Sequence, residues 1–171
     1  TAIGTILAEH LGVDFVDSDE EISRAANMSI PEIFDRDGED FFRLKETQII
    51  GRLLGSRPHI LSTGGGAFLS NENRKMISGN AVSVWLDAEL ETLWDRVKEK
   101  KSRPLLMVKD PKTALKNLYI SRKPQYAKAN MGQGGTNVLA PNNSKTYNTT
   151  SQPVIMAESA RNINAKNLHN T

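Results

Sequence analysis

Apolar residues recur along this chain with two different patterns, which predict helices and strands in turn. Ile3, Ile6, Leu7 and Leu11 fall at helical spacing and Gly12 follows them, so the chain is predicted to open inside a helix that Gly12 caps. Other segments are short apolar runs, some of them rich in β-branched residues, which favour buried strands. These runs predict strands at residues 14–16, 59–62 and 81–86.

The segments between these strands have helical spacing and recognisable helix ends. Residues 29–32, Ser-Ile-Pro-Glu, form a capping-box pattern with proline in the first turn, which predicts a short helix to about Phe34. A break near Gly38 should separate it from a longer helix over residues 39–54. Further helices are expected at residues 90–97 and 111–129. Because strands alternate with helices, the predicted fold class is α/β, a parallel sheet with helices on both faces.

The character of the sequence changes after Met131. Residues 132–170 are rich in Asn, Ser, Thr and Gly and show little periodicity, which is typical of a disordered or poorly folding tail. We therefore divide the chain into a domain at residues 1–131 and a polar tail at residues 132–171. Within that tail, only residues 153–157 and 158–169 are predicted as a last strand and helix.

Composition narrows the class of protein. The 171 residues include 38% hydrophobic and 25% charged ones, as expected for a soluble globular domain. The net charge of +2, with scattered basic residues, does not indicate a nucleic-acid partner. No apolar run reaches the roughly 20 residues of a membrane span. The absence of cysteine excludes disulfides and cysteine metal sites and is compatible with the cytoplasm, and the three histidines lack metal-ligand spacing.

Two acids follow the first predicted strand. If the strand continues through residues 15–19, Asp17 and Asp19 share one face, at the carboxyl edge where parallel sheets bind ligands. One acid can then serve a metal and the other a substrate hydroxyl. Alternatively, both simply open the following helix, where acids suit the positive end of its dipole.

Three glycines follow the second predicted strand. Gly64, Gly65 and Gly66 would let the backbone approach a ligand and offer amide groups to a phosphate or a sugar hydroxyl. The alternative is a flexible turn that needs positive φ. The residues themselves leave both interpretations open.

Arginines supply candidate anion sites. Arg43 precedes Glu46 by three residues on one predicted helix, so Glu46 could hold the guanidinium for bidentate binding of a carboxylate. The alternative is an ordinary helix ion pair, worth only ~0.2–0.5 kcal/mol. Taken singly, Arg103 and Arg122 are typical of solvated charges.

Taken together, six motifs of this chain occur in a characteristic order and spacing. Over residues 1–129 that order and spacing resemble those of the shikimate kinases. The motifs that carry the resemblance are Phe-Val-Asp-Ser-Asp-Glu-Glu-Ile (15–22), Met-Ser-Ile-Pro-Glu-Ile-Phe (28–34), Phe42-Arg43-x-x-Glu46, Thr63-Gly64-Gly65-Gly66-Ala67, Arg103-Pro104-Leu105-Leu106 and Arg122-x-Pro124-x-Tyr126.

The resemblance implies a small P-loop kinase with a five-stranded parallel sheet, a shikimate-binding region and a lid. Such an enzyme transfers the γ-phosphoryl group of ATP to the 3-hydroxyl of shikimate with Mg²⁺, on the route to chorismate and the aromatic amino acids. It implies a cytoplasmic monomer with a small-molecule substrate and without a nucleic-acid or membrane partner.

The resemblance also implies roles at the acceptor site. Asp19 matches the acid that bonds the shikimate hydroxyls and orients or deprotonates the acceptor. Arg43 and Arg122 match the pair that holds the shikimate carboxylate, with Glu46 in support. The residues implied to line the rest of this site are Gly64, Gly65 and Gly66, with backbone amides at the last two, and Phe34 and Phe42 as an apolar wall.

At the donor site, Thr1 matches a hydroxyl that binds Mg²⁺, and Asp17 matches an acid near Mg²⁺ that acts through water. Arg103 matches the lid arginine that closes over the phosphates. Arg96 matches a residue packed against adenine.

The chain departs from the family at both ends. Residues 1–4 match only the end of the phosphate-binding motif, so its glycine-rich loop, its lysine and the first strand, which lies at the sheet centre in this fold, are not in this sequence. The end of the chain does not continue as the family does. We interpret this as a truncated or frame-damaged reading of a kinase gene, and expect residues 1–171 by themselves to transfer phosphate poorly.

Three alternatives accompany this interpretation. A gluconate-type small-molecule kinase would be distinguished by a panel of acceptors. A non-catalytic shikimate-binding module would bind shikimate without turnover, and an inactive fragment would lack a cooperative unfolding transition.

Overall fold

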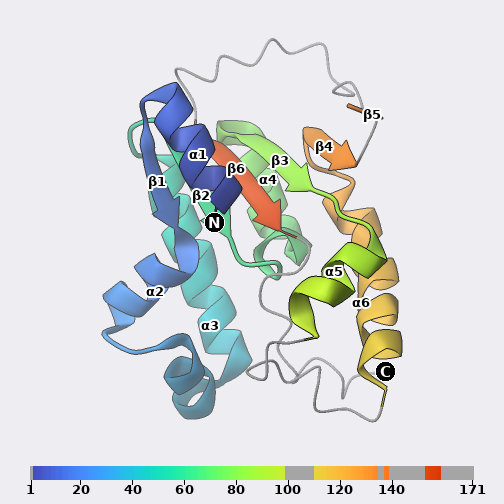
Figure 1. Cartoon of the computed structure of the whole chain (residues 1–171). Coiled ribbons are helices and arrows are strands. Elements are labelled where there is room, and N and C mark those ends of the chain that lie inside the picture. The colour runs from blue at the N-terminus through green and yellow to red at the C-terminus, as the bar shows by residue number, and fades with distance from the viewer. Residues whose placement is uncertain (1, 99–109, 135–136, 139–152, 159–171) are drawn as a thin grey trace.

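The computed structural model describes residues 2–98, 110–134, 137–138 and 153–158 (Figure 1). Helices and strands alternate over most of this length. The helices are α1 (Ala2–Leu11), α2 (Ser18–Ala26), α3 (Ile30–Leu54), the 3₁₀ turn η1 (Ala67–Leu69), α4 (Asn71–Asn80), α5 (Leu90–Val97) and α6 (Pro111–Tyr126). The strands are β1 (Asp14–Asp17), β2 (His59–Thr63), β3 (Val82–Leu86), β4 (Met131–Gly134), β5 (Asn137–Val138) and β6 (Val154–Glu158).

The strands form one six-stranded sheet in the order β1-β2-β6-β3-β4-β5 (Figure 1). Neighbours from β1 through β4 run parallel, and only the β4–β5 pair is antiparallel. Helices connect β1 to β2, β2 to β3 and β3 to β4, as crossovers between parallel strands require. The predicted α/β class is confirmed.

The last strand, β6, lies in the middle of the sheet. Val154 pairs with Ile60 of β2 on one side and with Val82 of β3 on the other. The strand predicted at residues 153–157 is therefore present, in the central position that the family resemblance assigns to a strand from the other end of the chain. Residue 158, where a helix was predicted to begin, is the last residue of β6, and the rest of that predicted helix, 159–169, lies outside the described residues. The division at residue 131 stays a prediction, but the sheet extends beyond it.

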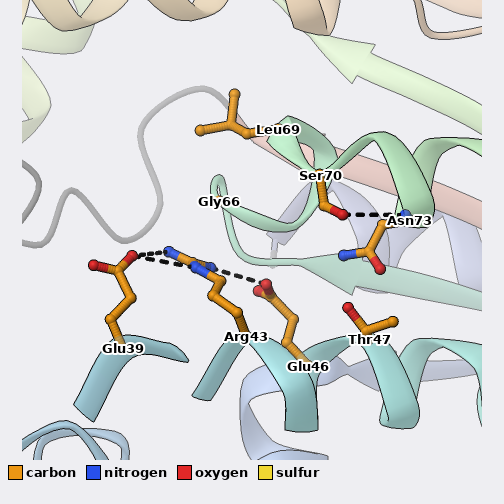
Figure 2. A pocket seen from close by; sticks show the side chains of 8 residues that line it. All are labelled: Glu39, Arg43, Glu46, Thr47, Gly66, Leu69, Ser70 and Asn73. Carbon is orange, nitrogen blue, oxygen red and sulfur yellow. Dashed lines mark hydrogen bonds and ion pairs between the residues drawn. The ribbon is translucent and has the colours of Figure 1, made fainter. Parts of the chain in front are cut away.

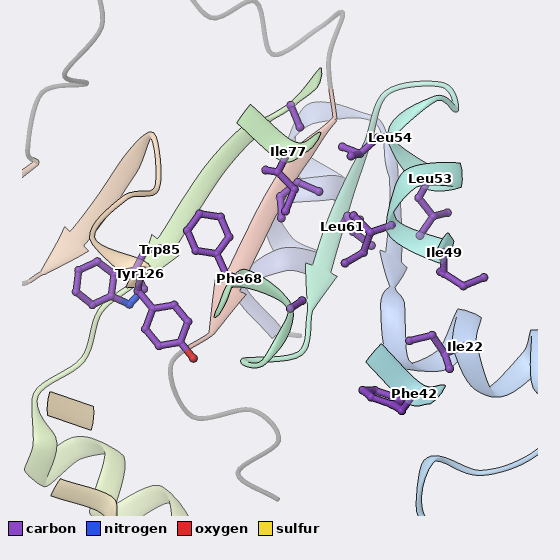
Figure 3. Close-up of a cluster of buried hydrophobic side chains, with 14 of the residues drawn as sticks. Ile22, Phe42, Ile49, Leu53, Leu54, Leu61, Phe68, Ile77, Trp85 and Tyr126 are labelled. Atoms are coloured by element: carbon purple, nitrogen blue, oxygen red, sulfur yellow. The ribbon is translucent and has the colours of Figure 1, made fainter. Parts of the chain in front are cut away.

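Alternate residues of β6 enter two apolar layers, because successive side chains of a strand point to opposite faces. Val154 and Met156 belong to the layer beneath α1, together with Ala8, Ile60 and Val82. Ile155 belongs to the larger layer on the other face, which Figure 3 shows between the sheet and the side chains of α3, η1 and α4. One short segment thus joins both halves of the core.

The predicted helix at the start of the chain is present as α1. The face that it buries carries small residues, and two of its isoleucines are exposed. Ile3 and Ile6 are 52% and 66% exposed, whereas Gly4 and Ala8 are buried. Gly4 packs so closely on the ring of Phe15 that a Cβ there would lie 3.1 Å from its Cδ2 atom. Small residues therefore set how near α1 approaches the sheet.

The long helix α3 begins and bends as predicted. Ser29 and Glu32 form the capping box, in which the Ser29 backbone N–H donates to Glu32 Oε2 at 2.8 Å. The helical path is interrupted at Gly38, whose φ of 83° and ψ of 178° suit glycine almost alone. Residues after this kink form the helical segment that carries Arg43 and Glu46.

Candidate functional site

At the end of β1, the structure corrects the predicted strand. The strand stops at Asp17 and α2 begins at Ser18, so Asp19 lies in the first turn of a helix. Asp17 is the N-cap, and its Oδ1 accepts a hydrogen bond from the backbone N–H of Asp19 at 3.0 Å. The two acids therefore do not share a strand face, because a local cap outcompetes one more residue of extended chain. The alternative interpretation, that the acids open a helix, describes the geometry.

Arg43 is held between two glutamates of its own helix (Figure 2). Its Nη1 donates to Glu46 Oε2 at 2.8 Å, and its Nε and Nη2 both donate to Glu39 Oε1, at 3.3 and 3.2 Å. Burial disfavours the charged guanidinium, but Glu46 and then Glu39 outweigh burial and raise the pKa of Arg43. The Arg43–Glu46 pair predicted from the sequence is present, and the second partner, Glu39, was missed although it stands four residues before Arg43.

Glu46 lies in a low-dielectric environment. Its side chain is 1% exposed, and burial raises its pKa, an effect that Arg43 opposes and that the charges of Asp19 and Glu39 reinforce. The charge of Asp19, on α2, therefore acts on the charged cluster of α3. A buried carboxylate beside Arg43 keeps that guanidinium charged and fixed in place.

The glycine segment after β2 lies against this arginine. A Cβ built on Gly66 would stand 2.6 Å from Nη2 and 2.7 Å from Cζ of Arg43. In the described chain, positive φ among glycines occurs at Gly12 and Gly38, not at Gly64, Gly65 or Gly66. Gly66 is therefore required by close approach, and the alternative of a turn needing positive φ does not apply to it.

Arg43 and Gly66 border a cavity of about 270 Å³ (Figure 2). Sequence reasoning named three of its lining residues, Arg43, Glu46 and Gly66. The others are Glu39, Thr47, Leu69, Ser70 and Asn73. The last three follow the glycine segment through η1 into α4, where no sequence motif marked them.

Two fully buried acceptors line this cavity. Asn73 donates from Nδ2 to the carbonyl oxygen of Ala67 at 3.0 Å, which ties α4 to the end of the glycine segment. Its Oδ1 and the Oε1 of Glu46 have no hydrogen-bond partner among the described residues. Buried oxygens of this kind suit a ligand hydroxyl or a bound water.

Tyr126 connects α6 to the same region. Its hydroxyl donates to the carbonyl oxygen of Gly65 at 2.6 Å. Burial raises the pKa of Tyr126, and the charges of Arg122 and then Arg43 oppose that rise. Arg122 is 6% exposed, and its Nη1 has no partner in the described part of the chain. Tyr126 was not among the predicted site residues, although it ends the Arg122 motif.

Phe34 and Phe42 lie together across the Gly38 kink. Their ring centroids are 4.6 Å apart, and both rings are buried. The guanidinium carbon of Arg43 lies 5.2 Å from the centroid of Phe42. The predicted apolar wall is thus adjacent to the predicted arginine, and its role toward a sugar ring stays a prediction.

The predicted donor-site residues lie apart from this cluster in the sequence. Thr1 and Arg103 lie outside the described residues, and Arg96 is exposed in the last turn of α5. Within the described ranges, no cluster of three or more His, Cys, Asp or Glu side chains could hold a metal. In the same ranges, no helix is long and apolar enough to cross a membrane.

Comparison with known proteins places these features in one family. The family profile described as "Shikimate kinase" matches residues 1–158, which extends past the motifs to the end of β6. The chain is 58% identical to the shikimate kinase of Ruegeria pomeroyi over 131 residues, covering 77% of this chain and 67% of that protein. It is 52% identical to the shikimate kinase of Cereibacter sphaeroides over 144 residues, covering 82% and 72%.

Solved structures agree. The shikimate kinase of Acinetobacter baumannii in complex with shikimate superposes with a TM-score of 0.72 at 36% identity, covering 80% of this chain and 76% of that one. The shikimate kinase of Aquifex aeolicus gives a TM-score of 0.70 at 32% identity, covering 80% of each chain.

Proposed function

Because the chain belongs to the shikimate kinase family, we propose that its cluster of Arg43, Glu46, Arg122 and Asp19 is the acceptor site of a kinase that transfers the γ-phosphoryl group of ATP to the 3-hydroxyl of shikimate. The observation that carries this assignment is the hydrogen bond from the buried Tyr126 hydroxyl to Gly65, because it joins the helix of Arg122 to the glycine segment that lies against Arg43. Two arginines on segments joined in this way suit an anionic ligand such as a carboxylate.

The carboxylate of shikimate would lie between Arg43 and Arg122. Arg122 is almost fully buried and keeps an N–H group without a protein partner among the described residues, which supports a ligand acceptor at that point. Arg43 is oriented by buried Glu46, so its direction is set before the ligand arrives. A related protein, the enzyme of A. baumannii, has been solved in complex with shikimate.

Asp19 would act on the hydroxyl groups of the substrate. Asp19 lies in the first turn of α2, where its backbone N–H donates to the capping side chain of Asp17. Its charge contributes to the raised pKa of Glu46. From there it can orient the acceptor hydroxyl and take its proton as phosphate is transferred. Phosphoryl transfer has a loose transition state, so alignment of this kind and neutralisation of charge supply most of the catalysis.

Mg²⁺ fits this site through few protein ligands. Magnesium is commonly bound by one or two carboxylates plus substrate phosphates and waters, and Asp17 is a buried carboxylate at the carboxyl end of β1. Asp17 would hold the ion through water, and the hydroxyl of Thr1 would bind it directly. When bound, Mg²⁺ neutralises charge on the phosphates of ATP. Arg103 would close over those phosphates and Arg96 would pack against adenine.

The test is calorimetric titration of shikimate into the chain, with gluconate as the comparison acceptor. We expect saturable binding of shikimate and none of gluconate. Arg122→Lys keeps the charge but loses the planar fork, so it should weaken shikimate binding about tenfold or more. Lys116→Arg, on the exposed side of the same helix, serves as the matched control and should bind as wild type.

Equal binding of both acceptors, or binding that Arg122→Lys leaves unchanged, would contradict the assigned site. Formation of ADP that depends on shikimate, measured with ATP and Mg²⁺, then separates a kinase from a module that only binds. Saturable binding without turnover would support the module.

A further inference from the structure

The two glutamates that flank Arg43 hold it unequally. Glu46 is 1% exposed and accepts at 2.8 Å, whereas Glu39 is 29% exposed and accepts at 3.2 and 3.3 Å through a single oxygen. Ion pairs near solvent are weak because water screens the charges. The bond to Glu46 is therefore the durable one, and the bond to Glu39 is the one that a competitor can replace.

The edge of the guanidinium that Glu39 contacts is more important for ligand binding than the strength of the Glu39–Arg43 ion pair. A carboxylate binds arginine best across two parallel N–H groups on one edge of the plane. Nε and Nη2 form such an edge, and Oε1 of Glu39 spans it. At the other end, Glu46 occupies Nη1, and Gly66 lies so near Nη1 and Nη2 that a Cβ built on it would overlap both. An incoming carboxylate that binds in bidentate fashion must therefore meet the edge that Glu39 covers.

Glu39 lies at the kink of α3, where the helical segment that carries the rest of the site begins. It directly follows Gly38, where α3 leaves helical geometry, and it borders the cavity of about 270 Å³ beside Arg43. Displacement of Glu39 by a ligand would require only that its side chain rotate, and the backbone of the helical turn that carries Glu46 would stay as it is. Figure 2 shows Glu39 and Glu46 approaching the guanidinium from opposite sides.

We propose that Glu39 is an internal competitor, a protein carboxylate that occupies the carboxylate-binding edge of Arg43 until the substrate carboxylate displaces it. The inference rests on the proposed function, which identifies the displacing ligand as shikimate. Glu39 is thus a specificity-determining residue: it keeps the arginine paired in the empty site and makes weaker anions compete for that edge. Glu46 remains in place throughout.

The experiment compares shikimate binding by the wild-type chain, Glu39→Gln and Asp40→Asn, measured by calorimetry. Asp40→Asn removes the same charge from the exposed neighbouring position and makes no contact with Arg43 among the described interactions. Glu39→Gln should bind shikimate about two- to fivefold more tightly, the factor expected for loss of an exposed ion pair. Asp40→Asn should leave the dissociation constant unchanged.

A neutral ligand separates competition from a general change in the site. The carboxamide of shikimate has no charge to compete with Glu39, so Glu39→Gln should give it no gain in affinity. Weaker shikimate binding by Glu39→Gln would mean that Glu39 positions Arg43, and the proposal would be overturned. An equal gain with the carboxamide, or no difference from Asp40→Asn, would overturn it as well.

Failure of the proposed function has a different signature, because no variant would then bind shikimate. Replacement of the Glu39 carboxylate by another carboxylate is still measurable, by following the Nε–H signal of Arg43 in NMR while acetate is added. The variant Arg43→Lys assigns the signal. Acetate should perturb this signal at a lower concentration in Glu39→Gln than in the wild type. Identical titrations would overturn the proposal independently of shikimate.

Discussion

Gly66 lies directly against the guanidinium of Arg43, so that a Cβ at residue 66 would stand 2.7 Å from Cζ of the arginine. The contact joins the loop after β2 to the segment of α3 that follows the Gly38 kink. Arg43 is fixed on one side by a backbone without a side chain and on another by the buried carboxylate of Glu46. Its geometry is therefore set by two distant segments together.

We predict that Gly66→Ala folds but binds shikimate about tenfold more weakly or worse. The added methyl group meets the end of a flexible side chain, so Arg43 can move aside at modest cost in stability but loses its hydrogen-bonding position, and hydrogen bonds to charged groups are worth about 1.5–3 kcal/mol. Calorimetry and thermal unfolding measure the two effects. Gly79→Ala is the control, because an added Cβ there meets nothing within 4 Å. Wild-type affinity in Gly66→Ala would contradict the close contact.

Glu46 makes stability depend on pH. Burial raises its pKa above the ordinary value of 4.5, so the folded chain binds this proton more tightly than the unfolded chain does. The contribution of Glu46 to the free energy of unfolding is therefore largest below pH 4.5 and declines as the pH rises toward the raised pKa. Glu46→Gln should remove this decline.

Urea denaturation at a series of pH values from 4 to 7 measures that slope. Exposed Glu72→Gln is the matched control and should keep the wild-type slope. Parallel curves for Glu46→Gln and the wild type would show that burial of Glu46 does not shift its protonation in the folded chain.

We predict that Tyr126→Phe lowers both stability and affinity for shikimate. The hydroxyl donates to Gly65 at 2.6 Å in a buried environment, and removing it leaves that carbonyl without this donor, at a cost of about 1–3 kcal/mol. The glycine segment should also loosen beside Arg43. Tyr119→Phe removes a less buried hydroxyl two turns earlier on α6, which donates to Asp87 at 3.2 Å, and should affect stability less and shikimate binding not at all. The reverse ranking in calorimetry would contradict the role assigned to Tyr126.

The central strand should be essential for folding. Ile155 is fully buried in β6 between β2 and β3, so Ile155→Ala should lower the free energy of unfolding by about 2–5 kcal/mol. Ile120→Ala removes the same atoms from a side chain that is 57% exposed on α6, and should change stability by less than about 1 kcal/mol. Similar losses in the two variants, measured by urea denaturation, would mean that β6 does not hold the centre of the sheet in solution.

Much of the fold follows from neighbours in sequence. The capping box at Ser29, the interruption at Gly38 and the Arg43–Glu46 pair each involve groups within four residues of one another, so spacing alone predicted them. Glu39 stands at the same kind of spacing from Arg43. Glu39 was missed because a helix surface offers several pairs at this spacing. Only the packing of Gly66 shows which edge of the arginine stays open to a carboxylate.

The error at Asp17 has a local cause as well. An extended strand and a helix N-cap both suit an aspartate at that position, and the sequence allowed either. In the structure the Asp17 side chain accepts the backbone N–H of Asp19, which satisfies one of the free amides of the first turn of α2, and the strand ends there.

The amino-acid sequence by itself predicted the α/β class, the family, and the elements α1, β1, α3, β2, β3, α5, α6 and β6. It did not predict α2, η1, α4, β4 or β5. Tertiary structure alone decided that β6 lies at the centre of the sheet, that Tyr126 bonds to Gly65, and that Gly66 meets Arg43. Local spacing fixes which face of an element is apolar. Strand order and contacts between distant loops depend on which apolar faces can be buried together, and that is settled only when the whole chain packs.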